Sequence, residues 1–372
     1  MEQVNITIDG KPITTRKDTT ILEAALENGL DIPHLCYYKG LSRTGVCRLC
    51  GVKVKIGNTW LNKTGHGLNS MHVSACTTEV VEGMEVIAHD EELTRARKLI
   101  IEMLFAQHWH DCLVCEANGV CELQKYAYQL GIEQKNLRFP ISEYTEPIDA
   151  SSALIIRDLN KCILCGRCVR ACHEITAQKI WHFFGRGSID DSLPKMNLMA
   201  GFNQPLAETN CVFCGQCVQS CPVGALTEKK ALRMGRAWEM QRVRTTCPYC
   251  GVGCQMWLHV KDGRITKVTA VEDAAPNQGR LCVKGRFGYD FIYSDERLKT
   301  PLIRENGQFR EASWDEALNL VVTRFQEIIA EHGPDAIGGV SSSRSINEDS
   351  YQMQKLFRSV IGTNNIDNCA RT

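Results

Sequence analysis

The spacing of the cysteines constrains this chain more than any other feature of its sequence. Twenty of the 372 residues are cysteine, and nearly all of them fall in tight clusters of the Cys-x-x-Cys kind. Thiols at that spacing converge on one metal centre far better than on distant disulfide partners. In a long chain without a recognisable signal peptide, such clusters favour metal ligation over a disulfide framework. The sequence therefore predicts iron–sulfur or zinc sites.

Charge and hydropathy exclude several other classes of protein. Lys plus Arg and Asp plus Glu both number 43, so the formal net charge of zero attracts neither nucleic acid nor an anionic membrane. Residues 1–10 are polar and alternating, without the basic and apolar regions of an export signal, which predicts a cytoplasmic location. The longest apolar stretch, residues 99–106, is short and contains Glu102, so we expect a buried helix face and no membrane span.

The first 76 residues predict a β-grasp domain around a small cluster. Residues 2–10 alternate and end in Asp9-Gly10, a hairpin turn signal, and a capping box of Thr20 and Glu23 then opens a helix that ends before Gly29. Four cysteines follow in a loop rich in glycine: Cys36, Cys47, Cys50 and Cys76. This pattern resembles the 2Fe–2S ferredoxin domain of complex I large subunits and iron-only hydrogenases. An insert at residues 57–70, longer than that family usually has, precedes Cys76.

A helix and a cluster site with a histidine come next. Apolar residues repeat at three and four positions and predict one buried stripe, made of Leu93, Ala96, Leu99, Ile100, Met103 and Leu104. The helix runs into HWHDCLVCEANGVC, where Cys112, Cys115 and Cys121 leave one corner of a 4Fe–4S cube without a ligand. The same His-Cys-Cys-Cys spacing occurs in the families just named, so the resemblance implies His108 as fourth ligand and His110 as a bystander. A neutral imidazole in place of a thiolate should raise the reduction potential.

An internal repeat predicts a two-cluster ferredoxin module. A linker at residues 140–160 leads into a strand, and then C-x2-C-x2-C-x3-C occurs twice, as CILCGRCVRAC and CVFCGQCVQSC. In such modules the fourth cysteine of each run ligates the other cube. One cube would be held by Cys162, Cys165, Cys168 and Cys221, and the other by Cys211, Cys214, Cys217 and Cys172. His173 stands where a proline is more common, and we interpret it as a solvated helix residue.

A last group of cysteines has a different spacing. Cys247, Cys250, Cys254 and Cys282 form C-x2-C-x3-C-x27-C, with a hairpin turn at Asp262-Gly263 inside the long interval. Nineteen cysteines and His108 thus fill five sites of four ligands, and Cys369 is left unassigned. We expect one 2Fe–2S and four 4Fe–4S clusters.

Two classes of function compete: an electron wire without its own chemistry, and an oxidoreductase whose wire feeds an active site. The segments CPYCGVGC, LCVKGRFG, PLIRENGQFREASWDEAL, SSSRSINEDSYQMQKLFR and GTNNIDNCAR discriminate between them. They resemble the start of a molybdenum- or tungsten-bis(molybdopterin guanine dinucleotide) formate dehydrogenase. With the N-terminal clusters, the whole chain resembles soluble NAD(P)- or ferredoxin-linked formate dehydrogenases of anaerobic bacteria. The alternative is a standalone wire subunit of a hydrogenase or a complex I-like assembly.

The resemblance implies roles for two cations. Lys284 matches the lysine that bridges the last cluster and the pterin, and Arg344 matches an arginine on the pterin side; the alternatives are a solvent-facing lysine and an ordinary cation before a helix. No Gly-x-Gly-x-x-Gly follows a strand, so we expect nicotinamide or ferredoxin to be handled by a partner. That partner would be a flavin and iron–sulfur diaphorase-like subunit, or a hydrogenase- or ferredoxin-linked complex, docking near the Cys36 or His108 cluster.

These inferences together predict an α+β multidomain chain. Its expected segments are a 2Fe–2S ferredoxin-type domain at 1–85, a helical 4Fe–4S domain with one histidine and three cysteine ligands at 86–145, a two-cluster ferredoxin-type domain at 146–240, a 4Fe–4S subdomain at 241–300 and an incomplete α/β molybdopterin domain at 301–372. In the last segment we expect a helix at 314–331 behind a Ser313–Glu316 capping box, one strand at 335–341 and a helix at 347–361.

The end of the chain carries an expectation of its own. A single strand with two helices cannot satisfy its edges. In the family resembled, the NNID-x-CAR-x run is followed at once by the metal-ligating cysteine or selenocysteine and a histidine. We therefore expect selenocysteine, encoded by UGA, at position 373 after Thr372, and no catalytic residue and no formate oxidation in residues 1–372 alone. A UGA codon followed by a histidine codon and a long open frame would support this, and a UAA or UAG codon would contradict it.

Overall fold

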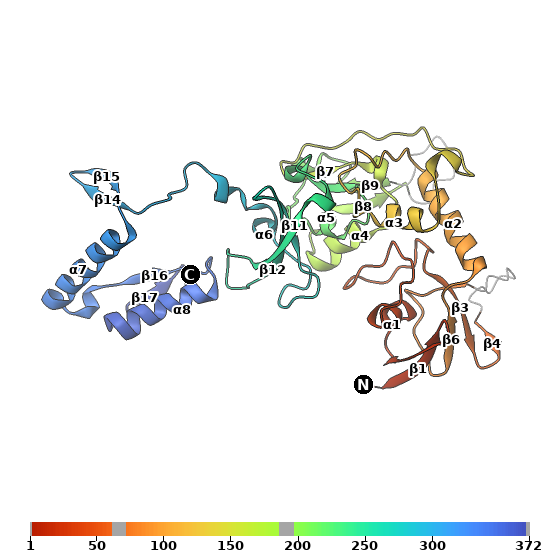
Figure 1. The fold of residues 1–372 in the computed structure, drawn as a ribbon, viewed down its shortest axis with the longest axis horizontal. Coiled ribbons are helices and arrows are strands. Elements are labelled where there is room, and N and C mark those ends of the chain that lie inside the picture. Colours follow the sequence, from red (N-terminus) through yellow and green to blue (C-terminus); the bar gives the residue numbers. More distant parts are fainter. Residues whose placement is uncertain (1, 62–71, 186–196, 370–372) are drawn as a thin grey trace. The chain divides into compact units, whose positions relative to one another are not determined.

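A computed structural model describes residues 2–61, 72–185 and 197–369 (Figure 1). The part of the expected insert from residue 62 onward lies outside the described residues. The chain forms two compact units, residues 1–240 and 241–372. Each unit is described by itself below, and the finer division into five segments stays a prediction.

The first unit opens with a mixed sheet of order β2-β1-β6-β3-β4, with β5 added on β3. Its strands are β1 (Gln3–Ile8), β2 (Lys11–Arg16), β3 (Gly51–Ile56), β4 (Thr59–Trp60), β5 (His72–Ser74) and β6 (Met84–Ile87). The expected hairpin is confirmed, because β1 and β2 pair antiparallel and the turn residue Asp9 has a φ of 49°. The expected capping box is confirmed as well, because Thr20 and Glu23 cap α1 (Ile21–Glu27) reciprocally.

The buried face of helix α2 (Glu91–Ala106) differs from the predicted stripe. Its fully buried row follows steps of four residues, namely Leu93, Arg97, Ile101 and Phe105. Leu99 and Met103, expected in the stripe, are 38% and 52% exposed. The physical reason is Arg97, which donates hydrogen bonds to the carbonyl oxygens of Leu49 and Gly51 in the cysteine loop. Because these carbonyls lie under the helix, a cation occupies a core position that hydrophobic periodicity assigns to apolar residues.

The rest of the first unit holds the internal repeat. Its helices and strands are α3 (Glu122–Gln129), β7 (Ile155–Arg157), α4 (Arg167–Arg170), the π-helical turn η3 (Ala171–Ile175), β8 (Trp181–Phe184), β9 (Asn197–Ala200), α5 (Gln216–Ser220) and β10 (Leu226–Glu228), with 3-10 turns η1 (Gln134–Asn136), η2 (Leu159–Lys161), η4 (Leu206–Glu208), η5 (Lys229–Ala231) and η6 (Ala237–Glu239). β7, the strand expected after the linker, pairs antiparallel with β10. Gly166 and Gly215, each with a φ of 72°, start the two matching helices.

The second unit begins with a three-stranded antiparallel sheet, β11-β12-β13. Its elements are β11 (Gln241–Thr246), β12 (Gln255–Lys261), β13 (Arg264–Ala270), α6 (Val283–Phe287), η7 (Asp290–Tyr293), β14 (Leu302–Glu305), β15 (Gln308–Glu311), α7 (Trp314–His332), η8 (Pro334–Ala336), β16 (Gly339–Ser341), α8 (Asn347–Lys355), η9 (Leu356–Ile361) and β17 (Ile366–Asn368). The expected hairpin turn at Asp262-Gly263 joins β12 to β13. Ile337, Phe357 and Ile361 form a small core behind β16.

Two expectations for this unit are wrong. The strand near residue 339 is not alone, because β17 pairs parallel with β16 in the register Gly339 to Ile366. A three-residue strand is too short for hydrophobic periodicity to reveal it. Ser313 caps α7 as expected, but the Glu316 carboxylate pairs with Arg310 on the preceding hairpin, so the capping box is only half formed.

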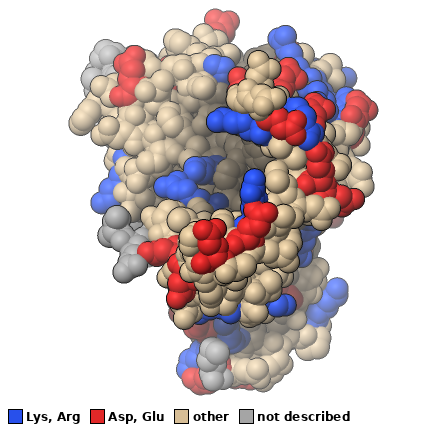
Figure 2. All heavy atoms as spheres, turned by 90° about the vertical axis from the view of Figure 1, so that its left-hand side faces the viewer, with Lys and Arg blue, Asp and Glu red and all other residues tan. Residues whose placement is uncertain are grey.

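Surface charge and helix length agree with the sequence. Figure 2 shows patches of both signs on the face drawn there, as a balanced composition suggests. Among the helices that the structure describes, none has the length and apolarity needed to cross a membrane.

Candidate metal centres

The four cysteines of the first domain meet at one point. Cys36 follows α1, Cys47 and Cys50 precede β3, and Cys76 follows β5. Hydrogen bonds from Cys47 and Cys76 lower the pKa of the Cys36 thiol, and a bond to Cys50 also involves Cys76. These contacts place the four sulfur atoms beside one another in a largely buried site. The structure thus brings Cys76 to the other three despite the long interval before it.

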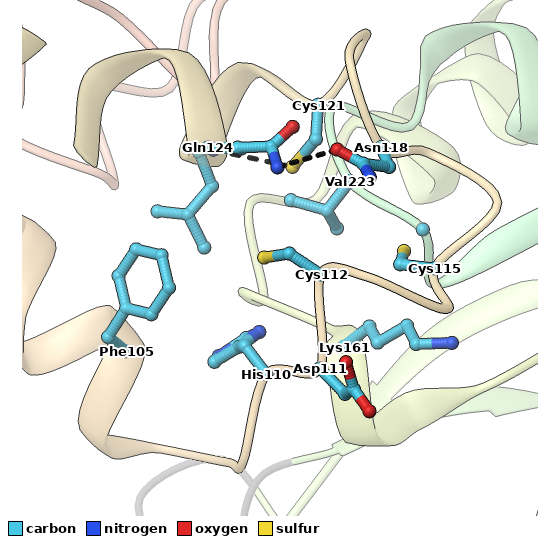
Figure 3. Close-up of a pocket in the computed structure, with 12 residues that line it drawn as sticks. Phe105, His110, Asp111, Cys112, Cys115, Asn118, Cys121, Gln124, Lys161 and Val223 are labelled. Atoms are coloured by element: carbon cyan, nitrogen blue, oxygen red, sulfur yellow. Dashed lines mark hydrogen bonds between the residues drawn. The ribbon is translucent and has the colours of Figure 1, made fainter. Parts of the chain in front are cut away.

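A second cavity is lined by three cysteines (Figure 3). Cys112 and Cys115 lie on the loop after α2, and Cys121 caps α3. The backbone of Gly224, just beyond the second ferredoxin run, closes the cavity, and a Cβ atom there would lie 2.7 Å from the Cys115 sulfur. Only glycine therefore leaves room for that thiol as it stands.

The two histidines near this cavity lie differently from each other. His110 lines the cavity, its ring packs edge-on against Phe105 at 4.9 Å, and burial lowers its pKa to about 4. His108 is not among the lining residues. However, its Nδ1 is buried without a hydrogen-bond partner among the described residues, while its ring also bonds to the backbone of Tyr144. A metal-ligating imidazole typically has one nitrogen held by a backbone carbonyl and the other left for the metal. His108 as ligand stays a prediction.

The internal repeat brings its cysteines together in the crossed sets that the sequence predicts. Cys162, Cys165, Cys168 and Cys221 line one cavity. In the other set, burial raises the pKa of Cys217 above its usual range, and negative charge on Cys214, Cys211 and Cys172 raises it further. Cys172 therefore lies with the second run, and Cys221 with the first.

Backbone geometry is repeated in the two runs. Leu164 and Phe213, the residues two after the first cysteine of each run, have φ values of 53° and 50°. Their backbone N–H groups both lie 3.4 Å from the sulfur of that cysteine. Strain of this kind in residues other than glycine is typical of functional loops. His173 is half-buried in η3, and its Nε2 lies 2.9 Å from the Trp181 carbonyl oxygen, so the interpretation as a solvated helix residue is wrong.

The last four cysteines meet at the start of the second unit. The backbone N–H of Cys247 donates to the Cys254 carbonyl at 2.8 Å. Burial raises the pKa of Cys254, and negative charge on Cys247, Cys250 and Cys282 raises it further. Lys284, on α6, places its Nζ 5.7 Å from the centre of the Tyr249 ring, between two of the cysteines in sequence. Its side chain is exposed in this chain, so the structure does not show the burial that a bridging role implies.

Another cavity, of about 410 Å³, lies at the carboxyl ends of β16 and β17. Its lining includes Ser341, Ser342, Ser343, Arg358 and Asn368. Arg344 is exposed and is not part of this lining, whereas Arg358, which the sequence reasoning missed, is. Ligands bind outside the carboxyl ends of parallel strands in open α/β sheets. That rule could have found the site, had the second strand been recognised.

Cys369, the cysteine left unassigned, follows β17. Its sulfur lies 3.3 Å from Ser343 Oγ, and hydrogen bonds from Ser343 lower its pKa to about 7. None of the cysteines, all of which the structure describes, is part of a disulfide. Within residues 2–61, 72–185 and 197–369, no three His, Cys, Asp or Glu side chains form a group that could hold a single metal ion.

Comparison with family models matches this series of sites in order. The matching models are a 2Fe-2S iron-sulfur cluster binding domain at residues 1–91, the NADH-ubiquinone oxidoreductase-G iron-sulfur binding region at 97–136, a 4Fe-4S dicluster domain at 161–225, the molybdopterin oxidoreductase Fe4S4 domain at 240–294 and molybdopterin oxidoreductase at 297–372. The chain belongs to the molybdopterin oxidoreductases that carry iron–sulfur domains. Its domains are iron–sulfur modules followed by the start of a molybdopterin oxidoreductase domain.

Several molybdopterin oxidoreductase relatives and one solved structure are similar to the chain. It is 40% identical over 370 residues to the NADPH-Fe(3+) oxidoreductase subunit alpha of Geobacter sulfurreducens, covering 99% of this chain and 40% of the relative. It is 34% identical to an NADH-quinone oxidoreductase component of Rhizobium meliloti, the second of its G-type subunits, covering 99% and 40%. Proteins of Staphylococcus aureus whose names propose a formate dehydrogenase are 32% identical, covering 100% and 39%.

A chain of an NAD+-reducing [NiFe]-hydrogenase in its H2-reduced state has a TM-score of 0.54 and 33% identity, over 62% of this chain and 90% of that one. The chain spans about 40% of the length of the curated relatives it matches.

Proposed function

We propose that these residues are the electron-transfer portion of a formate dehydrogenase catalytic subunit, which oxidises formate to CO2 and passes two electrons along five iron–sulfur clusters. The observation that carries the proposal is the grouping of every predicted cysteine ligand into its expected set, ahead of the matched molybdopterin domain. One 2Fe–2S cluster, four 4Fe–4S clusters and a molybdenum- or tungsten-bis(molybdopterin guanine dinucleotide) would supply the redox chemistry when bound. The protein supplies their position and environment.

The residues present suit these groups. Thiols are the ligands that iron–sulfur clusters require, and backbone N–H groups directed at the sulfur atoms, as at Leu164 and Phe213, favour the charged thiolate. At the cavity beside β16 and β17, three serine hydroxyls and the Arg358 guanidinium offer hydrogen-bond donors of the kind that phosphate groups need. Lys284 beside Tyr249 and Arg344 before α8 remain our proposed pterin-side cations.

The partner that takes the electrons belongs to the same proposal. We place a flavin and iron–sulfur diaphorase-like subunit near the His108 site, because large apolar side chains are exposed on the loop around its cysteines. Leu113 is 80% exposed, and Trp109, Val114 and Val120 are exposed too. Exposed apolar groups of this density are typical of a protein contact surface. The names of the Geobacter and Rhizobium relatives, NADPH-Fe(3+) and NADH-quinone oxidoreductase subunits, support a nicotinamide-linked partner.

The experiment is an acceptor survey on a protein that carries these residues with a complete molybdopterin domain, purified with its bound partners. Formate should reduce benzyl viologen and one of NAD, NADP or ferredoxin. A Leu113→Asp, Val114→Asp double variant should keep dye reduction and lose most reduction of the natural acceptor, while Phe202→Asp, at another exposed site, should change neither.

A different result would select the second candidate, an electron wire of a nicotinamide-linked oxidoreductase or hydrogenase-like assembly. The 40% identity to an NADPH-Fe(3+) oxidoreductase subunit and the hydrogenase chain favour that candidate. NADPH-driven reduction of the clusters, with no response to formate, would establish it and contradict formate oxidation.

A further inference from the structure

The two ferredoxin runs differ in charge at matching positions. Both read Cys-Gly-x-Cys-Val-x-x-Cys, but the first has Arg167 and Arg170 where the second has Gln216 and Gln219. The helices that carry these residues, α4 and α5, both start from a left-handed glycine with the same φ. Two positive charges therefore distinguish backbones that are otherwise built alike.

Arg167 is buried against the thiols of the first set. Its side chain forms a paired hydrogen bond with the Glu122 carboxylate, at 2.6 and 2.7 Å, and its Nε is buried without a hydrogen-bond partner among the described residues. Glu122 directly follows Cys121, so this ion pair links the loop of the second cysteine site to α4. An N–H group left over in such a site is available to a sulfur acceptor.

Arg170 is buried on the other side of the same short helix. It donates to the carbonyl oxygens of Ser42 and Cys36, in the loop of the first cysteine site, and to those of Cys165 and Gly166, at 3.4 and 3.3 Å. All these acceptors are neutral carbonyls, so no carboxylate among its hydrogen-bond partners cancels the charge.

Both charges act on the first set of thiols. Burial raises the pKa of Cys165 to about 12, and the positive charges of Arg167 and Arg170 oppose that rise. Arg167 also opposes the rise that burial causes in the pKa of Cys221, the cysteine contributed by the other run. Cations in a desolvated site interact with nearby charge much more strongly than they would in water.

We propose that Arg167 and Arg170 hold the reduction potential of the first cube, at Cys162, Cys165, Cys168 and Cys221, above that of the second. The inference rests on the proposed function, since it requires 4Fe–4S clusters in both runs. Uptake of one electron makes a cluster one unit more negative and breaks no protein bond, so buried cations and N–H donors beside it favour the reduced form. The neutral glutamines of the second run give no such stabilisation. Electrons in the wire would therefore occupy the first cube before the second.

The test is a redox titration with dithionite, followed by electron paramagnetic resonance on the full chain after anaerobic reconstitution. Cys162→Ser and Cys211→Ser identify the signals of the first and second cubes. The exchange Arg167→Gln, Arg170→Gln should lower the midpoint potential of the first cube by at least about tenfold in its one-electron equilibrium, ~59 mV. The reverse exchange, Gln216→Arg, Gln219→Arg, should raise that of the second. Arg170→Lys, which keeps the charge, should retain most of the first cube's potential.

The outcomes separate this inference from the proposed function. A wild-type chain without cube signals or iron would overturn both. Intact cubes whose potentials do not move in either exchange would overturn only the role of the arginines. If the glutamine exchange lost iron because the buried Glu122 contact is broken, the reverse exchange alone would decide, and an unshifted second cube would count against the proposal.

Discussion

The site beside the carboxyl end of α2 shows how much depends on a single side chain. Spacing favours His108 as the fourth ligand, and its partnerless Nδ1 agrees with that role, whereas the structure places His110 in the wall of the cysteine cavity. Both rings are largely neutral, because burial lowers both pKa values. Either could offer a lone pair, so geometry alone leaves the choice to experiment.

We predict that His108→Cys keeps the cluster and lowers its midpoint potential, because a thiolate adds negative charge where the imidazole is neutral. His108→Ala should lose about four iron atoms per chain, while His110→Ala should keep them. Iron analysis and redox titration of the three variants provide the measurement. Loss of iron in His110→Ala together with its retention in His108→Ala would show that the ligand is His110.

His259 on β12 predicts a pH dependence of folding in the second unit. Burial lowers its pKa to about 4, and its Nε2 lies 2.9 Å from Thr269 Oγ1. Between pH ~6.5 and this folded value, the unfolded state binds a proton that the folded state does not. The free energy of unfolding should therefore fall as pH decreases through that window, by up to ~3 kcal/mol, and this contribution should change little below it. Urea unfolding across pH 3–8 should show a flatter profile for His259→Gln; parallel profiles would contradict the assignment.

At the scale of secondary structure elements, α2 shows a polar group deciding which face is buried. Arg97 joins the helix to the backbone on both sides of Cys50, through the carbonyls of Leu49 and Gly51. The Lys53 ion pair with Asp90, which caps the helix, adds a second connection between α2 and β3. The first cysteine site is thus attached to the helix that leads to the second.

Arg97→Ala should lower the free energy of unfolding of the first unit by about 2–4 kcal/mol, because it leaves two buried carbonyl groups without donors. Met103→Ala, on the exposed side of the same helix, is the matched control and should change stability by less than ~0.5 kcal/mol. Thermal and urea unfolding of both variants measure the difference. Equal losses would mean that the carbonyl contacts contribute nothing specific.

At the scale of the whole molecule, the five groups of ligands predict a fixed metal content. We expect about 18 iron atoms per chain, from one 2Fe–2S and four 4Fe–4S clusters. Iron and sulfide analysis after anaerobic reconstitution, with electron paramagnetic resonance, measures this. Artificial dyes should exchange electrons with residues 1–372 alone, whereas formate should not reduce them. Stoichiometric zinc with little iron would contradict the cluster assignment.

Much of the candidate site could be predicted from sequence because its information is local. Ligand sets such as Cys162, Cys165 and Cys168 need only a short loop to converge, and the repeat itself indicates the exchange of Cys172 and Cys221. The helix cap at Thr20 and the turn at Asp9 are equally local, since each involves neighbours within a few residues.

Tertiary structure decided the features that depend on distant partners. Arg97 is buried only because carbonyls more than forty residues earlier need donors. β17 becomes a strand only beside β16, and this pairing creates the cavity that includes Arg358. Arg170 reads as one cation in a helix until the fold brings the Cys36 carbonyl to it. Composition and spacing thus determined which residues could hold clusters, while long-range packing decided which charges and hydrogen bonds surround them, because those groups meet only when the chain folds.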